Sequence, residues 1–483
     1  MRILYYDIDT LRADHLGCYG YCRDTSPHID RIASEGVRFD NCYASDTPCL
    51  PSRASLFTGR FGIHTGIVNH GGTAADLRLH GPERGFRHGA ARNSWVAALR
   101  QAGFYTVSVS PYAERHSAWW FYHGWREMYN PGKGGAEIAS EVLPYAMQWL
   151  DNHATEDNWF LHVNVWDPHT PYRTPLEYGN PFEDSPPPSW YTEEIRRKHY
   201  EGYGPHSARE PWGWRKREMP PRMPEEIGSL EDYKKWIDGY DTGIKYMDDH
   251  IGQILDALAH KGVLDETAII ISADHGENQG ELNIYGDHHT ADHPTCRVPL
   301  IIKWPGLPGG WVNRGLHYQL DMAATVIELL GGKVPERWDG RSFAEALRKK
   351  EDGGREYLVI SQCAWSCQRG VRYKEWLMIR TYHDGYHDFP PYMLFDIEKD
   401  PHELKNLADE RPEVVNECVK LLEEWHAEMM ETSDSQVDPL WTVIREGGPF
   451  HVRGRLREYC EYLRQTGRAR HAEALERRHR SEL

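Results

Sequence analysis

Short apolar runs that end close to an Asp, separated by segments of helical periodicity, constrain the fold of this chain more than any other feature. Each of the runs Ile3–Ile8, Trp159–Val165 and Ala268–Ser272 is followed within two residues by an Asp. Buried runs of this length that alternate with helices predict an α/β domain with a largely parallel sheet. Because the carboxyl ends of parallel strands meet at one edge of a sheet, we expect these acidic side chains to share a site.

Further elements continue the same alternation. The spacing of apolar residues predicts helices over His28–Gly36, Val96–Gly103 and Tyr240–Leu258. Two more short apolar segments, Tyr105–Ser110 and Val298–Ile302, are typical of strands. The N-terminal part of the chain therefore reads as one layered domain.

Residue composition and apolar periodicity change along the chain, and these changes predict its domains. Residues 1–350 form the first domain, within which residues 181–235 lack periodicity and are rich in Pro and Trp, which indicates a lid-like insertion. Residues 351–435 have shorter strands and a helix, which indicates a smaller α+β subdomain. Residues 436–483 form a basic helical tail, which we expect to dock on a neighbouring element or on a second subunit. A homo-oligomer formed through this tail is therefore one expectation.

Composition excludes several classes of function. The 483 residues carry 56 Lys and Arg against 73 Asp and Glu, a net charge of −17, which argues against general nucleic-acid binding. No apolar run is long enough to span a membrane, and carboxylates stand where a signal peptide needs an apolar core. We therefore expect a cytoplasmic protein, with its nine cysteines reduced.

The segment from Cys49 to Arg60 narrows the function. Residues 49–53 read Cys-Leu-Pro-Ser-Arg and are followed by Ala-Ser-Leu-Phe-Thr-Gly-Arg. This segment resembles the signature of type I sulfatases, members of the alkaline-phosphatase-like superfamily. The resemblance implies a large mixed, mostly parallel sheet between helices and a smaller C-terminal α+β domain with an antiparallel sheet and a helix. It also implies that a maturation enzyme converts Cys49 to formylglycine, whose hydrate attacks the sulfate ester.

The resemblance also implies a divalent cation. Asp9 lies where the family has its first calcium carboxylate, and residues 274–277, Asp-His-Gly-Glu, match the family motif that supplies two more ligands, Asp274 and His275. Residue 49 is expected to be the fourth ligand of the cation, beside Asp9, Asp274 and His275. Many relatives have a second Asp where this chain has a Thr, and Asp7 on the same strand face is a candidate replacement, either as a ligand or behind the ligands. Calcium is expected, with magnesium or manganese as alternatives.

Catalytic side chains are carried over in the same way. Residues 167–172, Asp-Pro-His-Thr-Pro-Tyr, resemble the family segment whose His protonates the leaving group or binds sulfate, so His169 is the expected general acid. Arg53 lies four residues after Cys49 on the same helix face and is expected to neutralise the formylglycine hydrate.

Two family lysines are missing. One follows the strand at 105–110, where Arg115 and His116 are the candidate replacements. The second belongs near residue 288, where His288 and His289 stand in a cluster of histidines. Substitution for the Lys is favoured there over metal binding.

These residues predict a sulfatase that acts on sulfate monoesters of a small sugar or of an aryl or alkyl alcohol. A phosphonate monoester or phosphodiester hydrolase on the same scaffold is the first alternative, because related sites of the superfamily cleave those anions. A non-catalytic, metal-dependent binding protein with an unmodified Cys49 is the second. Trp190, Trp212 and Trp214 are candidates either for stacking on the substrate or for the core.

Overall fold

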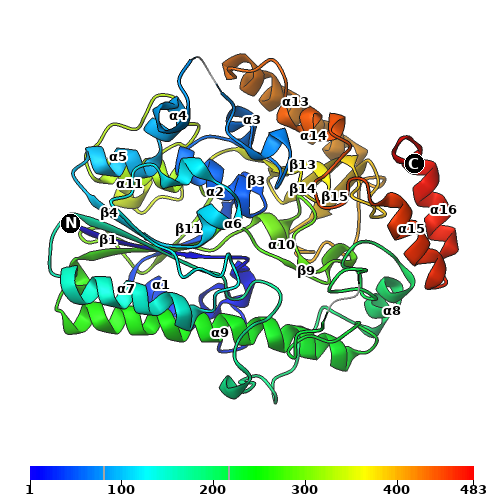
Figure 1. Cartoon of the computed structure of the whole chain (residues 1–483), viewed down its shortest axis with the longest axis horizontal. Coiled ribbons are helices and arrows are strands. Elements are labelled where there is room, and N and C mark those ends of the chain that lie inside the picture. The colour runs from blue at the N-terminus through cyan, green and yellow to red at the C-terminus, as the bar shows by residue number, and fades with distance from the viewer. Residues whose placement is uncertain (80–81, 216–217) are drawn as a thin grey trace.

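The structure, a computed structural model, describes residues 1–79, 82–215 and 218–483, and in these residues a sheet of eight strands runs through the molecule (Figure 1). From one edge to the other its strands are β11 (Trp311–Tyr318), β2 (Val37–Tyr43), β10 (Leu300–Lys303), β7 (Thr267–Ala273), β1 (Arg2–Ile8), β6 (Trp159–Val165), β4 (Tyr105–Val109) and β5 (Glu127–Tyr129).

The sheet is mixed and mostly parallel, as expected. Only β10 runs antiparallel to its neighbours β2 and β7 among the pairs of this sheet in the described chain. Strands β1, β6 and β7 are buried along their whole length, which is typical of a sheet with helices on both faces. Ile8 is level with Val165 of β6 and with Ala273 of β7. The three acidic strand ends of the sequence therefore meet at one edge.

Helices cover both faces of the large sheet (Figure 1). One layer holds α1 (Pro27–Glu35), α7 (Ala139–His153) and α9 (Leu230–His260), and α9 packs against both α1 and α7. The opposite layer holds α2 (Cys49–Thr58), α5 (Trp95–Gln101) and α11 (Asp321–Leu329), which also pack together. Short helices fill the connections: α3 (Gly62–Thr65), α4 (Gly89–Arg92), α6 (Tyr112–Arg115), α10 (His293–Cys296) and α12 (Ala344–Lys349).

Helix α9 begins ten residues earlier than its expected start at Tyr240. Ser229 caps it, because its hydroxyl accepts a hydrogen bond from the backbone N–H of Asp232 at 3.1 Å. Tyr233, Trp236 and Ile237 continue its buried face. Residues 230–235, at the start of α9, therefore belong to a helix although the sequence assigned them to the insertion.

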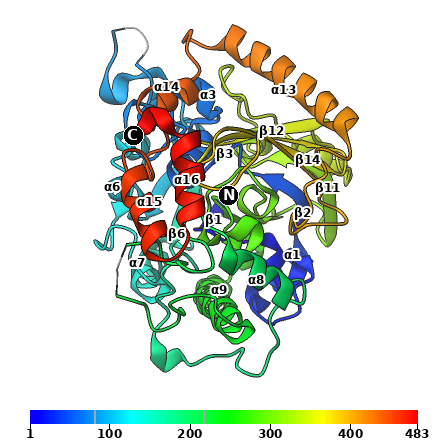
Figure 2. The ribbon, with the colours of Figure 1, turned by 90° about the vertical axis from the view of Figure 1, so that its right-hand side faces the viewer.

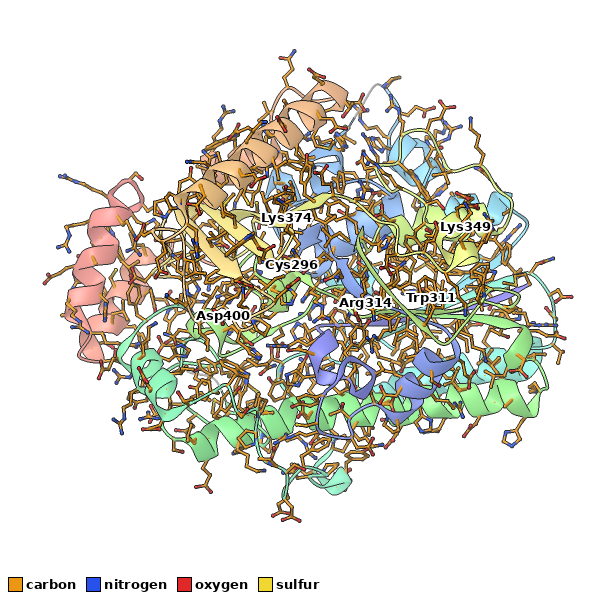
Figure 3. The ribbon with its side chains drawn as sticks, turned by 180° about the vertical axis from the view of Figure 1, so that it is seen from behind. Cys296, Trp311, Arg314, Lys349, Lys374 and Asp400 are labelled. Atoms are coloured by element: carbon orange, nitrogen blue, oxygen red, sulfur yellow. The ribbon has the colours of Figure 1, made fainter. Side chains whose placement is uncertain are left out.

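A second sheet forms the smaller C-terminal part. Its strands are β15 (Tyr392–Asp396), β14 (Trp376–His383), β13 (Cys367–Tyr373), β12 (Tyr357–Gln362) and β3 (Asp46–Thr47), in that order. All of its neighbours are antiparallel except β12 and β3. Helix α13 (Pro412–Thr432) packs on β13. Figure 3 shows this sheet from behind, with Lys374 at the turn between β13 and β14 and with Trp311 and Arg314 on β11 of the large sheet. The expected α+β part with an antiparallel sheet and a helix is confirmed.

The tail packs against the insertion of its own chain. The tail holds α14 (Pro439–Arg445), α15 (Leu456–Gln465) and α16 (Ala469–Arg478), and the insertion holds α8 (Glu193–Glu201). In Figure 2 α15 and α16 lie on the side that faces the viewer, and their buried residues share one apolar cluster with Tyr203 of the insertion. A buried ion pair joins Arg468 of the tail to Glu210 of the insertion at 3.0 Å. The domain boundaries at 350 and 435, and an oligomer formed through the tail, stay predictions; residues 216 and 217 of the insertion lie outside the described residues.

All nine cysteines are free thiols. Across the ranges 1–79, 82–215 and 218–483, the helices are too short or too polar for any of them to cross a bilayer.

Candidate active site

Three buried carboxylates surround the guanidinium of Arg53 at the strand ends. Arg53 lies on α2, and its Nε donates to Asp7 Oδ2 at 2.8 Å. Its Nη1 donates to Asp9 Oδ2 at 2.9 Å and to Asp274 Oδ2 at 2.6 Å. Asp9 follows β1 and Asp274 follows β7, so the level strand ends bring the two carboxylates together. All four side chains are buried.

Asp7 faces Arg53 and His162 rather than the cluster of candidate metal ligands. Its carboxylate accepts two hydrogen bonds from Arg53, and its Oδ2 lies 3.2 Å from His162 Nε2. Burial alone would raise the pKa of Asp7, but Arg53 and His162 lower it. Of the two roles that the sequence left open for Asp7, this geometry favours the one behind the ligands.

The remaining donors form a set that fits a cation. Ligand atoms of Asp9, Cys49, Asp274 and His275 all lie within 4.8 Å of one another. Asp9 Oδ1 is buried and accepts no hydrogen bond from any described residue. Burial and the charge of Asp9 raise the pKa of Asp274 to about 7, although Arg53 opposes this shift. Three carboxylates around one guanidinium leave excess negative charge, and a divalent cation would neutralise it.

Cys49 lies at the first turn of α2, where its thiol is 1% exposed. Its Sγ lies 3.2 Å from His275 Nε2. Burial raises the pKa of this thiol well above its usual value, and the charges of Asp9 and Asp274 add to the shift. Without a cation beside it, a thiol in this environment stays protonated and is a poor nucleophile.

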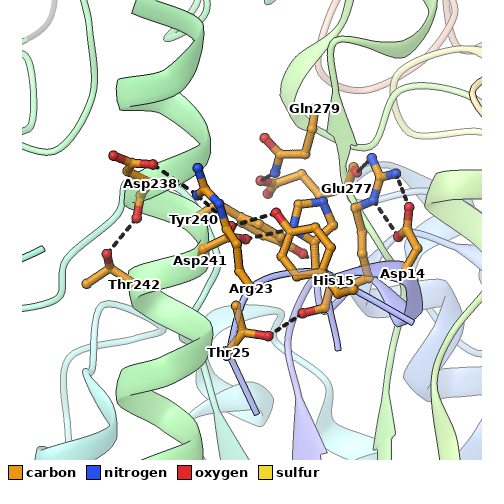
Figure 4. Close-up of polar contacts among 12 residues, drawn as sticks. Asp14, His15, Arg23, Thr25, Asp238, Tyr240, Asp241, Thr242, Glu277 and Gln279 are labelled. Carbon is orange, nitrogen blue, oxygen red and sulfur yellow. Dashed lines mark hydrogen bonds and ion pairs between the residues drawn. The ribbon is translucent and has the colours of Figure 1, made fainter. Parts of the chain in front are cut away.

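The segment that follows β1 is fastened to α9 (Figure 4). Tyr240 of α9 donates to the carbonyl of Thr10 at 2.7 Å. Asp241 on the next position lies 2.7 Å from His15 Nδ1 and accepts from Arg23 at 2.9 Å. These contacts explain the polar residues on the buried face of α9, and they hold the backbone next to Asp9.

His169 stands over the site on the loop that follows β6. Its Nδ1 contacts the carbonyl of Thr170, and its Nε2 lies 3.9 Å from Asp9 Oδ1. Burial lowers the pKa of His169 to about 4, against an opposing contribution from Asp9. The hydroxyl of Thr170 donates to the carbonyl of Gly286 at 2.9 Å and ties the loop to β9 (Tyr285–Asp287).

Arg115 ends helix α6, which follows β4, and His116 is the next residue; both line the same cavity as His169. The Arg115 guanidinium lies 4.6 Å from the centre of the Trp166 ring and donates to the carbonyl of Gly134 at 3.1 Å. His116 Nε2 is buried without a hydrogen-bond partner among the described residues. Burial, followed by the charge of Arg115, lowers the pKa of His116 well below its usual value.

The two histidines after β9 separate into different positions. The His288 ring lies 4.3 Å from that of His275 and faces the site. The His289 ring stacks on Trp365 at 3.8 Å, and its Nδ1 lies 2.8 Å from His387 Nε2. His289 does not line the cavity described next, so a direct contact between His289 and substrate, which we expected, has no support in the geometry.

A cavity of about 350 Å³ opens above Cys49, and the expected residues Arg115, His116, His169 and His288 line it. Trp212 and Trp214 also line it, whereas Trp190 stacks on His402 at 4.3 Å. Other polar and aromatic residues that line the cavity were not predicted, because no sequence motif marks them. They are His70, Arg173, His206, Trp365, His451 and Arg455. They come from loops, the insertion, the second sheet and the tail, and the fold alone brings them together.

A sequence model of the sulfatase family matches residues 3–332, which include every candidate ligand and catalytic residue described above. The chain belongs to the sulfatase family. A second model, described as the C-terminal part of N-sulphoglucosamine sulphohydrolase, matches residues 280–432. Family membership makes the chain an enzyme of sulfate ester hydrolysis. The first model covers the strands of the large sheet from Ile3 onward, and the second model covers β12 to β15 of the second sheet.

Curated relatives are similar over most of their length. An N-acetylglucosamine-6-O-sulfatase of Bacteroides thetaiotaomicron is 23% identical and covers 92% of this chain and 89% of its own. A choline-sulfatase of Rhizobium meliloti is 26% identical over 80% of this chain and 78% of its own. A multifunctional alkaline phosphatase superfamily protein of Trinickia caryophylli is 25% identical over 79% of this chain and 85% of its own length.

Solved structures share the fold of this sulfatase. One, a complex with its substrate D-glucosamine-2-N,6-O-disulfate, has a TM-score of 0.69 and 21% identity, and covers 89% of this chain and 98% of its own. The phosphonate monoester hydrolase of Silicibacter pomeroyi has a TM-score of 0.67 and 19% identity, and the match covers 90% of this chain and 96% of the hydrolase. At these identities the likeness establishes the fold, which agrees with the expected alkaline-phosphatase-like architecture.

Proposed function

We propose that this sulfatase hydrolyses the sulfate monoester of a small sugar or of an aryl or alkyl alcohol, with residue 49 as formylglycine. The observation that carries the proposal is the convergence of Cys49, Asp9, Asp274 and His275 beneath one cavity. A formylglycine made from Cys49 by a maturation enzyme would supply, as its hydrate, the oxygen that attacks sulfur. A calcium ion, or magnesium or manganese in its place, would be held by Asp9, Asp274, His275 and residue 49 and would withdraw charge from the sulfate oxygens.

The protein's own side chains provide the charge balance. The Arg53 guanidinium sits among Asp7, Asp9 and Asp274, directly behind residue 49, where it offsets negative charge that gathers on the nucleophile. Arg115, which lines the cavity, would bind the sulfate oxygens in the place of a family lysine. His116 and His288 contribute further nitrogen donors on the same walls.

His169 is suited to protonate the departing alcohol. Its Nδ1 is held by the carbonyl of Thr170, so its Nε2 is the atom that points over the site. When the S–O bond of the ester breaks, the electron pair goes to the leaving oxygen, which takes the proton from Nε2. The negative charge of a bound sulfate ester raises the pKa of His169 from its depressed value and favours the protonated form.

The cavity walls indicate the class of alcohol. Trp212 and Trp214 offer aromatic faces of the kind on which a sugar or aryl ring stacks. Arg173 and Arg455 add positive charge beyond the sulfate position. A volume of about 350 Å³ suits a small ester rather than a polymer.

Replacement of the nucleophile tests the proposal. Cys49→Ala is expected to lower kcat/KM for an aryl sulfate by at least about a thousandfold, because no other group can attack sulfur. Cys418→Ala, which removes a buried thiol from α13, is the matched control and should keep its activity. Full activity of Cys49→Ala would refute the proposal.

Phosphonate monoester hydrolysis is the second candidate. His275 supplies a nitrogen ligand where the resembled motif commonly has Asn, and the two family lysines are absent from this chain. Parallel kinetics on an aryl sulfate and an aryl phosphonate decide between the two reactions. A higher kcat/KM for the phosphonate would replace the sulfatase proposal.

A non-catalytic role predicts an unmodified residue 49. The intact mass of the protein, produced together with a formylglycine-generating enzyme, distinguishes the two states, because conversion of the thiol to an aldehyde changes the mass of residue 49. A complete retention of the thiol mass together with absence of turnover would favour a binding protein.

A further inference from the structure

A second group of potential ligands lies beside the active-site cavity, around the carboxylate of Asp287. Three imidazoles surround this carboxylate: Oδ2 lies 3.2 Å from His206 Nδ1, and Oδ1 lies 3.4 Å from His288 Nε2 and 3.5 Å from His289 Nε2. The side chain of Asp287 is only 11% exposed. A carboxylate removed from water among imidazoles is typical of a cation site.

The spacing of these donors fits a tetrahedral transition metal. A zinc ion bound at about 2.0–2.1 Å by nitrogen and oxygen donors places neighbouring donors about 3.3 Å apart. His206 Nδ1 lies 3.2 Å from Asp287 Oδ2, and His289 Nε2 lies 3.5 Å from the other oxygen, Oδ1. With one ligand atom taken from each residue, the three atoms lie within 4.8 Å of one another. Small side-chain movements would close the site.

The orientation of His289 is fixed from behind. The His289 ring stacks on the Trp365 indole with 3.8 Å between the ring centres, and its Nδ1 lies 2.8 Å from His387 Nε2. A hydrogen bond to the far nitrogen of an imidazole is the usual support of a metal-binding histidine. His289 Nε2 is consequently aimed at Asp287, is fully buried, and has no hydrogen-bond partner among the described residues.

The site has an open side. His206 and Asp287 line the cavity above Cys49, whereas His289 forms the back of the group. Three protein ligands with one position left toward a cavity are the arrangement of an accessible zinc site. His206 belongs to the insertion and Asp287 to β9, so an ion held here would also join the insertion to the body of the protein.

We propose that His206, Asp287 and His289 bind one zinc ion, separate from the cation at Asp9, Asp274 and His275. Two imidazoles and one carboxylate suit zinc, whereas calcium prefers an all-oxygen set. The ion fastens the insertion over the cavity. His288 lies between the two sites, because its ring also faces His275.

Metal content tests the proposal without reference to turnover. Protein stripped with a chelator and dialysed against zinc chloride is expected to retain one equivalent more of zinc than His206→Gln or His289→Gln treated identically. His64→Gln is the matched control: His64 is a buried imidazole 2.7 Å from Asp339, and it belongs to no three-ligand group among the described residues. His64→Gln should bind as much zinc as the unaltered protein.

Two further measurements make the outcome decisive. Anomalous diffraction at the zinc edge should place a peak between His206, Asp287 and His289, and zinc should slow proteolysis within residues 202–215 in the unaltered protein but not in His206→Gln. Equal zinc content in the variants and the unaltered protein, or a peak only at Asp9, would overturn the proposal. If His289→Gln fails to fold, His206→Gln at the cavity edge decides the question alone.

Discussion

The chemistry of single residues in this site is dominated by buried charge. Asp7, Asp9 and Asp274 share one guanidinium, and Asp9 Oδ1 has no hydrogen-bond partner in the described part of the chain. Such an arrangement stays unsatisfied without a cation. Cation binding should therefore raise the stability of the protein as well as prepare it for substrate.

His169→Gln tests the general acid by the choice of leaving group. With an alkyl sulfate, whose alcohol departs poorly without a proton, kcat/KM should fall by about 10²–10⁴-fold. With a nitrophenyl sulfate, whose phenolate departs unaided, the loss should be much smaller.

His116→Gln provides the comparison for this experiment. Because His116 is expected to face the sulfate rather than the leaving oxygen, its replacement should lower kcat/KM for both esters by a similar factor. An equal loss on both esters in His169→Gln would assign that histidine to sulfate binding instead.

At the residue scale, sequence reasoning reached the groups that a local motif marks. Helical spacing placed Arg53 on the same face as Cys49, and strand ends placed Asp9 near Asp274. Spacing alone could not decide the role of Asp7, because Asp7 and Asp9 lie on the same strand face and only the three-dimensional position of Arg53 and His162 separates them. His70 and His451 carry no local signal and meet only in the fold, at 3.0 Å.

Among the elements, helix α9 supports the loop that carries His169. Two glycines on α9 face this loop: a Cβ at Gly243 would lie 3.0 Å from Pro168, and one at Gly239 would lie 2.6 Å from the Tyr172 ring. The close approach of loop to helix therefore depends on the absence of side chains at these positions.

Gly239→Ala is expected to displace the loop. The new methyl group would also lie 2.7 Å from the carbonyl oxygen of Arg222, so the backbone must move, at a cost of about 1–3 kcal/mol. Denaturant unfolding and kcat/KM should both show the loss. Gly89→Ala, at a helical position with open space around it, should leave both unchanged or slightly raise stability.

Docking of α16 is expected to depend on pH. Burial would lower the pKa of His479, but hydrogen bonds to Asp384 and Glu482 raise it to about 9. His383, Arg478 and Tyr386 also contact these acids: His383 and Tyr386 contact Glu482, and Arg478 contacts Asp384. A raised pKa means that the stabilising contribution of His479 is complete below about pH 6.5, the unfolded value, and is lost as pH rises through about 9.

Hydrogen exchange of α16 measures this effect. Amide protection of residues 469–478, corrected for the intrinsic effect of pH, should decrease between pH 7 and pH 10. His479→Gln should lower protection at pH 7 and remove most of the dependence on pH. A constant protection factor in the unaltered protein would contradict the assignment.

Helices and strands with a strong apolar pattern could be predicted from the sequence. Those that form only because they pair with a distant segment could not. β6 matches its predicted bounds, because Trp159–Val165 is a continuous buried run. β3 escaped prediction, since a two-residue strand is recognisable only by its pairing with β12. The early start of α9 was signalled by Ser229 and Asp232, a capping pattern that the high Pro and Trp content of the preceding segment obscured.

On the scale of the whole molecule, the insertion and the tail form one wall. Arg468 and Glu210 make two hydrogen bonds of 3.1 and 3.0 Å, and both side chains are at most 4% exposed. Around them, Tyr203, Leu456 and Tyr459 pack into one cluster. We therefore expect the cavity to depend on a contact between residues that do not line it.

Arg468→Met tests this dependence. Loss of the guanidinium leaves the buried carboxylate of Glu210 with the hydroxyls of Tyr459 and Tyr462, each at 3.4 Å, as its remaining side-chain partners among the described residues, and the free energy of unfolding should fall by about 3–5 kcal/mol. Arg464→Met, which removes an exposed partner of Glu476 on the same tail, should cost less than about 1 kcal/mol. If the two variants unfold at the same denaturant concentration, the buried pair does not stabilise the wall.

The burial of Cys49 at the floor of this cavity sets an order of events during protein synthesis. Cys49 leaves the ribosome early, whereas His451 and Arg455, which complete the walls above it, leave it near the end. For the proposed conversion to formylglycine, a modifying enzyme would need the extended segment around Cys49 within that interval, before the chain closes over it. The yield of active protein should therefore follow the ratio of modification rate to translation rate, and slower translation should raise it.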